Sequence, residues 1–325
     1  MPNTTVAARL LALGAALIAA TACFAADAYP DHKVRMIVPF AAGGPTDVIG
    51  RIVAERLSEV LGQQIYVENL PGAGGNLGVE EAARAAPDGY TVLAVSTGFI
   101  INPSMYSKIG YDPIKNFAPI SLVAASPNVV TVHPSAAAKN LKELVALIKA
   151  NPGKFSFAQP ATGSTPHLAG ELFKQMFDLD LVMVPFAGAA LAVNSTLGNH
   201  TPIAFTALPP AIGAIKDGSL RGIAILAKQR VAALPELATN IEEDVPGLES
   251  DTLTGIVAPA GTPRAIVDQW HDAIVKMTAD SEVRNKLDAL GFVPVADTPA
   301  EFEDRIKSEA ARWDKVIKAA GIHVD

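Results

Sequence analysis

The segment from residue 34 to residue 47 reads VRMIVPFAAGGPTD. Its first five residues predict a buried β-strand, and residues 39–45 predict the turn that follows it. Thr46 or Asp47 is a candidate N-cap for a helix, because short polar side chains accept hydrogen bonds from the first free amides. Apolar residues then recur at helical spacing as far as Gly62, which ends the helix. The segment therefore predicts a strand–turn–helix unit of an α/β domain.

The same order of elements recurs along the chain. Capping residues mark helix starts at Thr298, which is followed by Glu301, and Pro166 is placed at the first position of another helix. The tetrapeptide VPFA occurs at residues 38–41 and again at residues 184–187, which suggests two similar lobes. Alternating strands and helices predict α/β units on largely parallel sheets. Further strands are predicted at residues 65–67, 91–95, 120–124, 129–132 and 155–158.

Length and composition narrow the class of protein. The chain has 325 residues, of which 50% are hydrophobic and 18% are charged, and its formal net charge is −7. This much apolar surface excludes a disordered chain, and the length predicts one large domain or about two smaller ones. An acidic chain without a basic run excludes nucleic acid as a partner. The histidines do not lie at metal-ligand spacing, so we expect no metal site. No other cofactor is expected either.

Residues 1–28 have the pattern of a signal peptide. Arg9 is the only charged side chain before an apolar run over residues 10–22, which is shorter than the ~20 residues of a membrane span. Ala28 ends an Ala-Asp-Ala cleavage motif, so we expect the mature chain to begin at Tyr29 and to reside in the periplasm. Cys23, the single cysteine, is an alternative site of lipid attachment. Cleavage after Ala28 removes it and with it any disulfide or thiol chemistry.

Three turns of small residues precede helices and are candidates for a binding site. In residues 40–47 and in residues 161–168, the backbone N–H groups at a helix start suit a carboxylate or a phosphate. A tight turn without a ligand is the alternative for each. The third, residues 71–78, is rich in glycine but has Leu77 where the dinucleotide-binding pattern requires glycine. His167 is a candidate for orienting a ligand or acting as a base, or for merely hydrogen-bonding its own turn.

Taken in order, these motifs resemble one family, the substrate-binding receptors of tripartite tricarboxylate transporters, also called Bug receptors. The resemblance covers nearly all of the chain after residue 28. The matching segments are residues 29–30, 38–47, 69–78, 87–91, 163–164, 167–168, 184–188, 215–221 and 258–263.

The resemblance implies a type II periplasmic-binding-protein fold, an α/β architecture in which two lobes joined by a two-strand hinge close over a ligand. It implies strand crossings near residues 124–128 and 252–257. Lobe 1 would then comprise residues 29–125 and 252–325, and lobe 2 residues 126–251.

The family holds a carboxylate between two turns through backbone amides, hydroxyls and ordered water. Ala187 stands where the family usually has Lys or Arg, and Leu253 and Thr254 replace an aromatic pair, so the resemblance leaves the identity of the ligand open. Carried onto this chain, it implies ligand-binding residues Phe40, Ala41, Ala42, Gly43, Gly44 and Asp47 in one turn, Thr162, Gly163, Ser164 and His167 in the other, and Asn76, Thr97 and Gly188 in the walls.

The leading interpretation is a monomeric periplasmic receptor that catalyses no reaction. It captures a small organic anion, a mono- or dicarboxylate, and delivers it to membrane permease subunits or to a sensor. One alternative is an α/β hydrolase-like enzyme that uses Ser164, His167 and Asp47 for acyl transfer, although Ser164 lacks the G-x-S-x-G nucleophile elbow. The other is a binding module that serves a sensor only.

Overall fold

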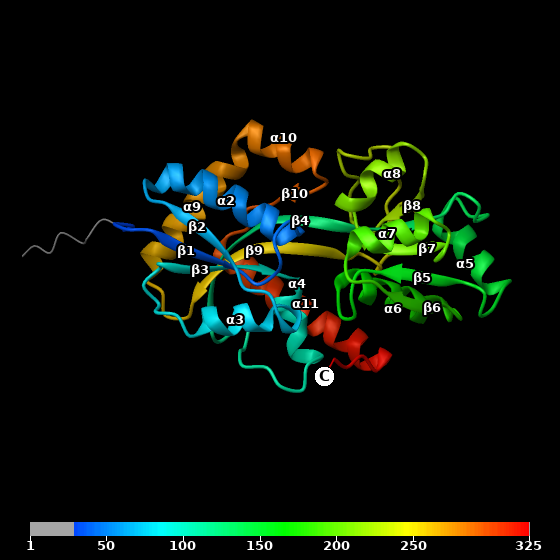
Figure 1. The fold of residues 1–325 in the computed structure, drawn as a ribbon, viewed down its shortest axis with the longest axis horizontal. Helices are drawn as coiled ribbons and strands as arrows, with labels where there is room; N and C mark the ends of the chain where they lie inside the picture. The colour runs from blue at the N-terminus through cyan, green and yellow to red at the C-terminus, as the bar shows by residue number, and fades with distance from the viewer. Residues whose placement is uncertain (1–28, 325) are drawn as a thin grey trace, which may run out of the picture.

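The computed structural model describes residues 29–324 and consists of two α/β lobes that lie side by side (Figure 1). The strand order of the sheet is β2-β1-β3-β9-β4-β7-β5-β6, with β8 and β10 also paired to β4. The predicted signal peptide, with Cys23 and the cleavage motif, lies outside the described residues. Within residues 29–324, none of the helices combines the length and the apolar character that a bilayer crossing demands.

Lobe 1 is built on three parallel strands covered by helices. Its core packs Trp270 and Ile49 against the apolar face of the sheet. The strands are β1 (Val34–Val38), β2 (Ile65–Asn69) and β3 (Thr91–Ser96). The helices are α2 (Pro45–Leu61), α3 (Asn76–Ala83), α4 (Thr97–Ile101), α9 (Arg264–Ala279), α10 (Ser281–Ala289) and α11 (Pro299–Ala320), with η1 (Ala73–Gly75), η2 (Asn102–Ser104) and the short strand β10 (Val293–Pro294) between them.

Lobe 2 has a second sheet with its own core. Phe157, Phe173 and Phe205 are fully buried there and pack on one another. The strands are β5 (Ser156–Gln159), β6 (Val182–Pro185), β7 (Ile203–Ala207) and β8 (Arg221–Ile225), and the helices are α5 (Leu141–Lys149), α6 (Thr165–Phe177), α7 (Ala189–Leu197), η3 (Pro209–Ala211) and α8 (Ile212–Lys216).

Two antiparallel strands, β4 (Phe117–Val132) and β9 (Asp251–Pro259), connect the lobes. β4 pairs with β9 and then continues into lobe 2, where it pairs with β7 and β8. The prediction of separate strands at residues 120–124 and 129–132 is therefore wrong. Pro127 pairs in register with Asp251, so the proline does not interrupt the strand.

The second crossing lies at the start of β9. The chain changes its hydrogen-bond partners from lobe 2 to lobe 1 at Ser250 to Thr252, which includes the expected boundary 251/252 and lies at the near end of residues 252–257. Ser250 accepts the N–H of Asn128 and donates its own to Leu226, both in lobe 2. Thr254 and the three residues after it pair with β3 and so belong to the sheet of lobe 1.

Helix starts follow the sequence signals with two differences. The capping box of Thr298 and Glu301 opens α11 as predicted. Helix α2, however, begins at Pro45, so Thr46 and Asp47 lie in its first turn, and no side chain caps it. Proline suits the first helical position because the amide it lacks would have no partner there. Helix α6 likewise begins one residue before Pro166.

Candidate functional site

The candidate turns lie at the carboxyl ends of parallel strands, one in each lobe. The first turn connects β1 to α2, and the second connects β5 to α6. In Figure 1, the arrows of β1 and β5 point toward the opposite lobe. Carboxyl ends of strands are where α/β sheets bind ligands, so both turns are placed at the boundary between the lobes.

The first turn is held together by the side chain of Asp47. Asp47 Oδ2 accepts the Gly43 N–H at 2.8 Å and Arg51 Nε at 3.0 Å, and Oδ1 accepts Asn69 Nδ2 at 2.8 Å. Burial alone would raise the pKa of Asp47, but these hydrogen bonds outweigh burial and hold the pKa below its usual value. Both carboxylate oxygens are thus used inside the turn, so Asp47 shapes the turn.

The backbone of this turn remains open. Ala41, Ala42 and Gly43 are exposed, and a Cβ built on Gly44 would have only the Ala41 carbonyl within 4 Å, at 3.7 Å. Gly43 has φ +85°, a conformation that favours glycine. Among residues 29–324, the N–H groups of Ala41 and Ala42 donate no hydrogen bond. Together with the uncapped start of α2, they form a patch of unpaired donors.

Polar side chains hold the second turn in a similar way. Gln159 Oε1 accepts the Ala161 N–H at 2.7 Å, and His167 Nδ1 accepts the Gly163 N–H at 2.9 Å. Ser164 is the N-cap of α6, and its hydroxyl accepts the His167 N–H at 3.4 Å. The exposed Thr162 has an N–H with no partner among the described residues. The second turn therefore also presents a free donor at a helix start.

The arrangement of His167 does not match a catalytic base. Its side chain is 2% exposed, and burial lowers its pKa to about 4, with a smaller effect from Lys174. Because Nδ1 accepts a backbone N–H, the proton of the neutral ring lies on Nε2. Ser164 Oγ is bonded to the His167 amide, not to its ring. The third residue of the hydrolase alternative, Asp47, has its carboxylate engaged in the other lobe.

The predicted wall residues have different surroundings. Asn76 is buried, and its Oδ1 accepts Asn102 Nδ2 at 2.6 Å. Thr97 uses its hydroxyl at the strand crossing, where it accepts the Leu253 N–H at 3.0 Å. Gly188 precedes α7, and a Cβ built on it would have no atom within 4 Å. The ring of Phe40 lies against Gly75: a Cβ built on this glycine would lie 3.1 Å from Cζ of Phe40.

Two contacts bring the second turn against lobe 1. A Cβ built on Gly163 would lie 2.6 Å from Cε of Met105, which follows η2. Thr165 Oγ1 lies 2.7 Å from Thr252 Oγ1 at the strand crossing. The lobe 2 turn is therefore in direct contact with lobe 1 at Gly163 and Thr165.

Sequence reasoning did not find four residues that support the turns: Asn69, Gln159, Arg51 and Met105. Asn69 and Gln159 are the last residues of β2 and β5, and a polar residue ending a buried strand was an available signal. Arg51 lies four residues after Asp47, the spacing at which helical side chains pair. Nothing in the local sequence marks Met105.

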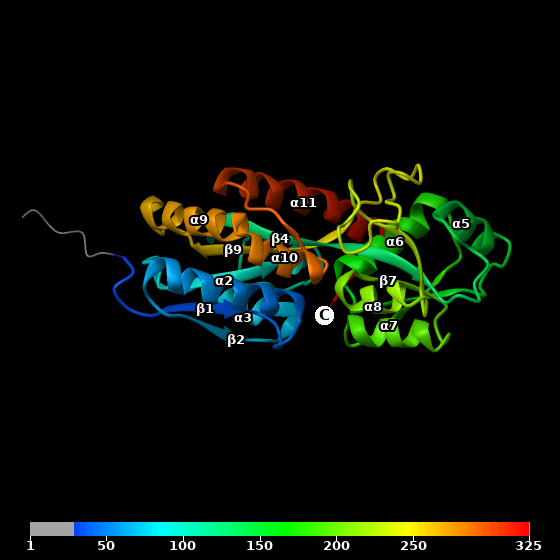
Figure 2. The same cartoon turned by 90° about the horizontal axis from the view of Figure 1, so that it is seen from above.

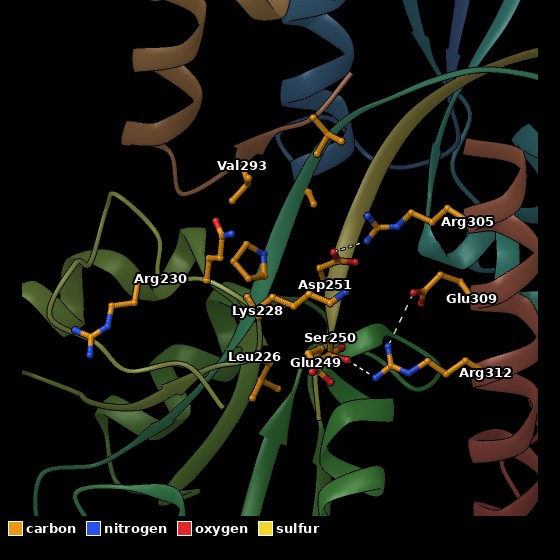
Figure 3. Close-up of a pocket in the computed structure, with 15 residues that line it drawn as sticks. Leu226, Lys228, Arg230, Glu249, Ser250, Asp251, Val293, Arg305, Glu309 and Arg312 are labelled. Carbon is orange, nitrogen blue, oxygen red and sulfur yellow. Dashed lines mark hydrogen bonds and ion pairs between the residues drawn. The ribbon is translucent and has the colours of Figure 1, made fainter. Parts of the chain in front are cut away.

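A separate cavity of about 850 Å³ opens beside the strand crossing and is drawn in Figure 3. Its walls include Leu226, Asp251, Val293, Arg305 and Arg312, and none of the predicted site residues lines it. Within residues 29–324, no cluster of His, Cys, Asp and Glu side chains is arranged to hold a metal ion.

Comparison with known proteins decides the family. Residues 49–322 match the model of the tripartite tricarboxylate transporter family receptor. The chain belongs to this receptor family. The resemblance drawn from the motifs is thereby confirmed, and the chain is a solute-binding receptor of the tripartite tricarboxylate transporter type.

Solved structures of similar proteins share the receptor's fold. The periplasmic binding protein BugD is 34% identical, with a TM-score of 0.78 over 91% of this receptor and 99% of that chain. Rpa4515 of R. palustris, solved with adipate, is 31% identical, with a TM-score of 0.81 over 91% and 99%. MatC of Rhodopseudomonas palustris, solved with malate, is 29% identical, with a TM-score of 0.77 over 89% and 100%. The two-lobed periplasmic-binding-protein fold is confirmed, and family membership implies a periplasmic location.

Proposed function

We propose that this receptor binds a small organic carboxylate between the turn 40–47 of lobe 1 and the turn 161–167 of lobe 2. The observation that carries the proposal is the pair of helix starts, one in each lobe, whose backbone N–H groups have no partner within residues 29–324. Such groups together with the helix dipole favour an anion. The adipate and malate bound by two similar receptors support a dicarboxylate.

No cation contacts the ligand directly in this proposal. Residues 40–47 and 160–168 contain neither lysine nor arginine. Arg51 approaches the first turn, but its guanidinium is occupied by Asp47 and by Asn69, whose Oδ1 it reaches at 3.0 Å. Amides, the Ser164 hydroxyl and bridging water then supply the hydrogen bonds to the carboxylate. Selectivity among ligands then comes from the shape of the site and from the positions of the backbone N–H groups in the two turns.

The receptor acts by a hinge motion in which ligand contact with both lobes selects the closed form. The lobe boundaries are proposed at residues 125/126 and 251/252. The closed receptor delivers its ligand to the membrane permease that the transporter family implies. We propose that it works as a monomer and catalyses no reaction. The Ser164 hydroxyl is bonded to the His167 amide and not to its ring, which disfavours the acyl-transfer alternative. A sensor is the alternative recipient of the ligand.

Calorimetry with a series of carboxylates tests the proposal. Succinate, malate and adipate are compared with acetate, inorganic phosphate and a neutral diester of adipic acid. We expect micromolar or tighter binding of at least one dicarboxylate and none of the diester. Binding of the diester, or of phosphate in preference to every carboxylate, would contradict the proposed ligand class. Esterase assays on the diester would reveal the catalytic alternative.

Export is tested separately by N-terminal sequencing of protein from the periplasm. We propose that residues 1–28 are removed and that Tyr29 becomes the first residue. In the fold Tyr29 is anchored, because its hydroxyl accepts Trp270 Nε1 at 2.7 Å and donates to the Gly89 carbonyl at 2.7 Å. A chain that retains Met1, or that carries lipid on Cys23, would contradict this processing.

A further inference from the structure

The cavity of about 850 Å³ lies on one side of the crossing strands, with walls from both lobes. Lobe 1 contributes Val293 and α11, and lobe 2 contributes Leu226 and the residues after it. Figure 2 shows α11 on one side of β4 and β9, and α3 and α7 on the other. We call the α11 side the rear of the hinge and the side of α3 and α7 the front.

The side chains of β9 separate the front from the rear. Successive residues of a strand point to opposite faces. Asp251 points to the rear, where its carboxylate binds Arg305 Nη2 of α11 at 2.6 Å. Thr252 points the other way and meets Thr165 at the start of α6, beside the second candidate turn. The cavity and the candidate turns therefore lie on opposite faces of the crossing strand.

Arg312 ties the two lobes together at the rear. It lies on α11 of lobe 1, beside Trp313, and its Nη2 donates to the carbonyls of Gly247 and Glu249. Figure 3 shows the contact with Glu249. Leu248, between those carbonyls, is fully buried in the core of lobe 2. Trp313 is buried in a cluster made mostly of lobe 1 residues, which also includes Leu168 of α6, and the Arg312 guanidinium lies 4.5 Å from its ring centroid. The two ends of this contact are thus anchored in different lobes: Arg312 in lobe 1 and residues 247–249 in lobe 2.

We propose that this rear clasp, formed by Arg312 with the Gly247 and Glu249 carbonyls, sets the receptor's ligand affinity from outside the binding site. Rotation about the crossing strands that brings the front turns together moves α11 away from residues 247–249. Closure must then break charge-assisted hydrogen bonds, and the cost of breaking them is subtracted from the free energy of ligand binding. Arg312 is an affinity-determining residue that never touches the ligand.

The predicted change in ligand affinity rests on the proposed function. The predicted change in the distance between the lobes does not, because that distance is measurable without a ligand. Spin labels are placed on the front by Leu77→Cys in α3 and Leu191→Cys in α7, whose native side chains are 57% and 52% exposed. A receptor produced from Tyr29 onward lacks Cys23, the single native cysteine, so only the introduced cysteines carry labels. Electron double resonance then reports the distance between the lobes in the ligand-free receptor.

We expect Arg312→Ala to shift this distance distribution toward shorter values. In the unlabelled receptor, the same change lowers Kd for the best carboxylate about 3- to 10-fold. Arg264→Ala is the matched control, because Arg264 pairs with Asp268 inside one helix of lobe 1. It leaves both quantities unchanged.

A second variant covers the case in which Arg312→Ala fails to fold. Val293→Trp fills the rear cavity with a large side chain, which forces the rear apart and closes the front. Val275→Trp is its control, because Val275 lies on α9 and is 40% exposed, close to the 41% of Val293. We expect shorter front distances for Val293→Trp only.

The outcomes distinguish the clasp from the site. Distance distributions that stay the same in both variants, or that lengthen, overturn the rear clasp whatever the ligand does. Shorter distances with a lower Kd support it fully. Shorter distances with no carboxylate binding in any variant support the clasp and contradict the proposed function.

Discussion

Met105 of lobe 1 occupies the space into which a side chain at Gly163 of lobe 2 would project. A Cβ built on Gly163 would lie 2.6 Å from Cε and 2.7 Å from Sδ of Met105, far inside normal contact distance. Gly163 also has φ +81°, which disfavours any residue with a Cβ. The positive φ favours glycine at this position, and any side chain there would also require the flexible end of Met105 to move.

Gly163→Ala should destabilise the receptor by more than about 1 kcal/mol, since both the backbone strain and the contact oppose it. Thermal denaturation measures the loss. Met105→Ala added to Gly163→Ala should recover the part that is due to the contact, so the two changes should not be additive. Strict additivity would mean that the lobes do not meet at these residues in solution.

Gly44→Val should abolish carboxylate binding while the fold is retained. Gly44 has φ −76°, which valine adopts, and its surroundings are open, so the melting temperature should stay near that of the parent. The branched side chain, however, blocks the path to the free amides of the turn. Arg35→Ala is the control, because Arg35 pairs with Glu68 and Glu81 and takes no part in the turn. Calorimetry that finds the reverse pattern would replace the amide site with an arginine site.

Ser164→Ala should weaken ligand binding by about 1–2 kcal/mol through the loss of a hydroxyl partner. It also removes the N-cap of α6, which costs about 1 kcal/mol of folding stability. Ser164→Gly separates the two effects, because glycine at an N-cap costs only a few tenths of a kcal/mol. Both variants should lose the same affinity, and only the alanine variant should melt clearly earlier. Unchanged affinity in both would exclude the hydroxyl from the site.

His167 should make the receptor less stable in mild acid. Its pKa in the fold is lowered from 6.5 to about 4 by burial, so between these values the unfolded chain binds the proton more strongly. The contribution of His167 to the free energy of unfolding should therefore be constant above pH ~6.5. It should fall as the pH decreases toward about 4, by at most about 3 kcal/mol. Urea unfolding at several pH values checks this. His167→Gln, which can still accept the Gly163 N–H, should lack this part of the pH dependence, and an identical slope in the variant would refute the assignment to His167.

Asp47→Asn should loosen the first turn. The two carboxylate oxygens accept three hydrogen bonds, and the change replaces one of these oxygens with an NH2 group and removes the negative charge. We expect a loss of about 1–3 kcal/mol in stability together with weaker ligand binding. Asp268→Asn is the control, since its ion pair with Arg264 is exposed and lies within one helix. Equal effects of the two changes on unfolding would show that Asp47 does not organise the turn.

Local sequence patterns predicted the elements whose determinants are local. The strand 34–38, its small-residue turn and the capping box at Thr298 each depend on neighbouring residues, and the structure has all three. The place of the second crossing depends instead on which residues of β9 pair with β3, a contact between segments far apart in the chain. The same holds for Met105, because its role follows from where η2 meets the other lobe. The contact of Asp47 with the ligand stays a prediction. Its hydrogen bonds with Asn69 and Arg51 could not be predicted, because these residues meet it only in the fold.

The insertion of lobe 2 between the two crossings has a consequence for biosynthesis. The strands that belong to lobe 2 alone, β5 to β8, are all translated before β9. All strands of the lobe 2 sheet have therefore been synthesised while the chain is still growing. Lobe 1 must wait, because β3 needs β9 as its neighbour and the core around Trp270 needs α9. The part of the receptor that is translated first is thus the last to acquire its native partners, and until then its apolar strands lack the neighbours that bury them.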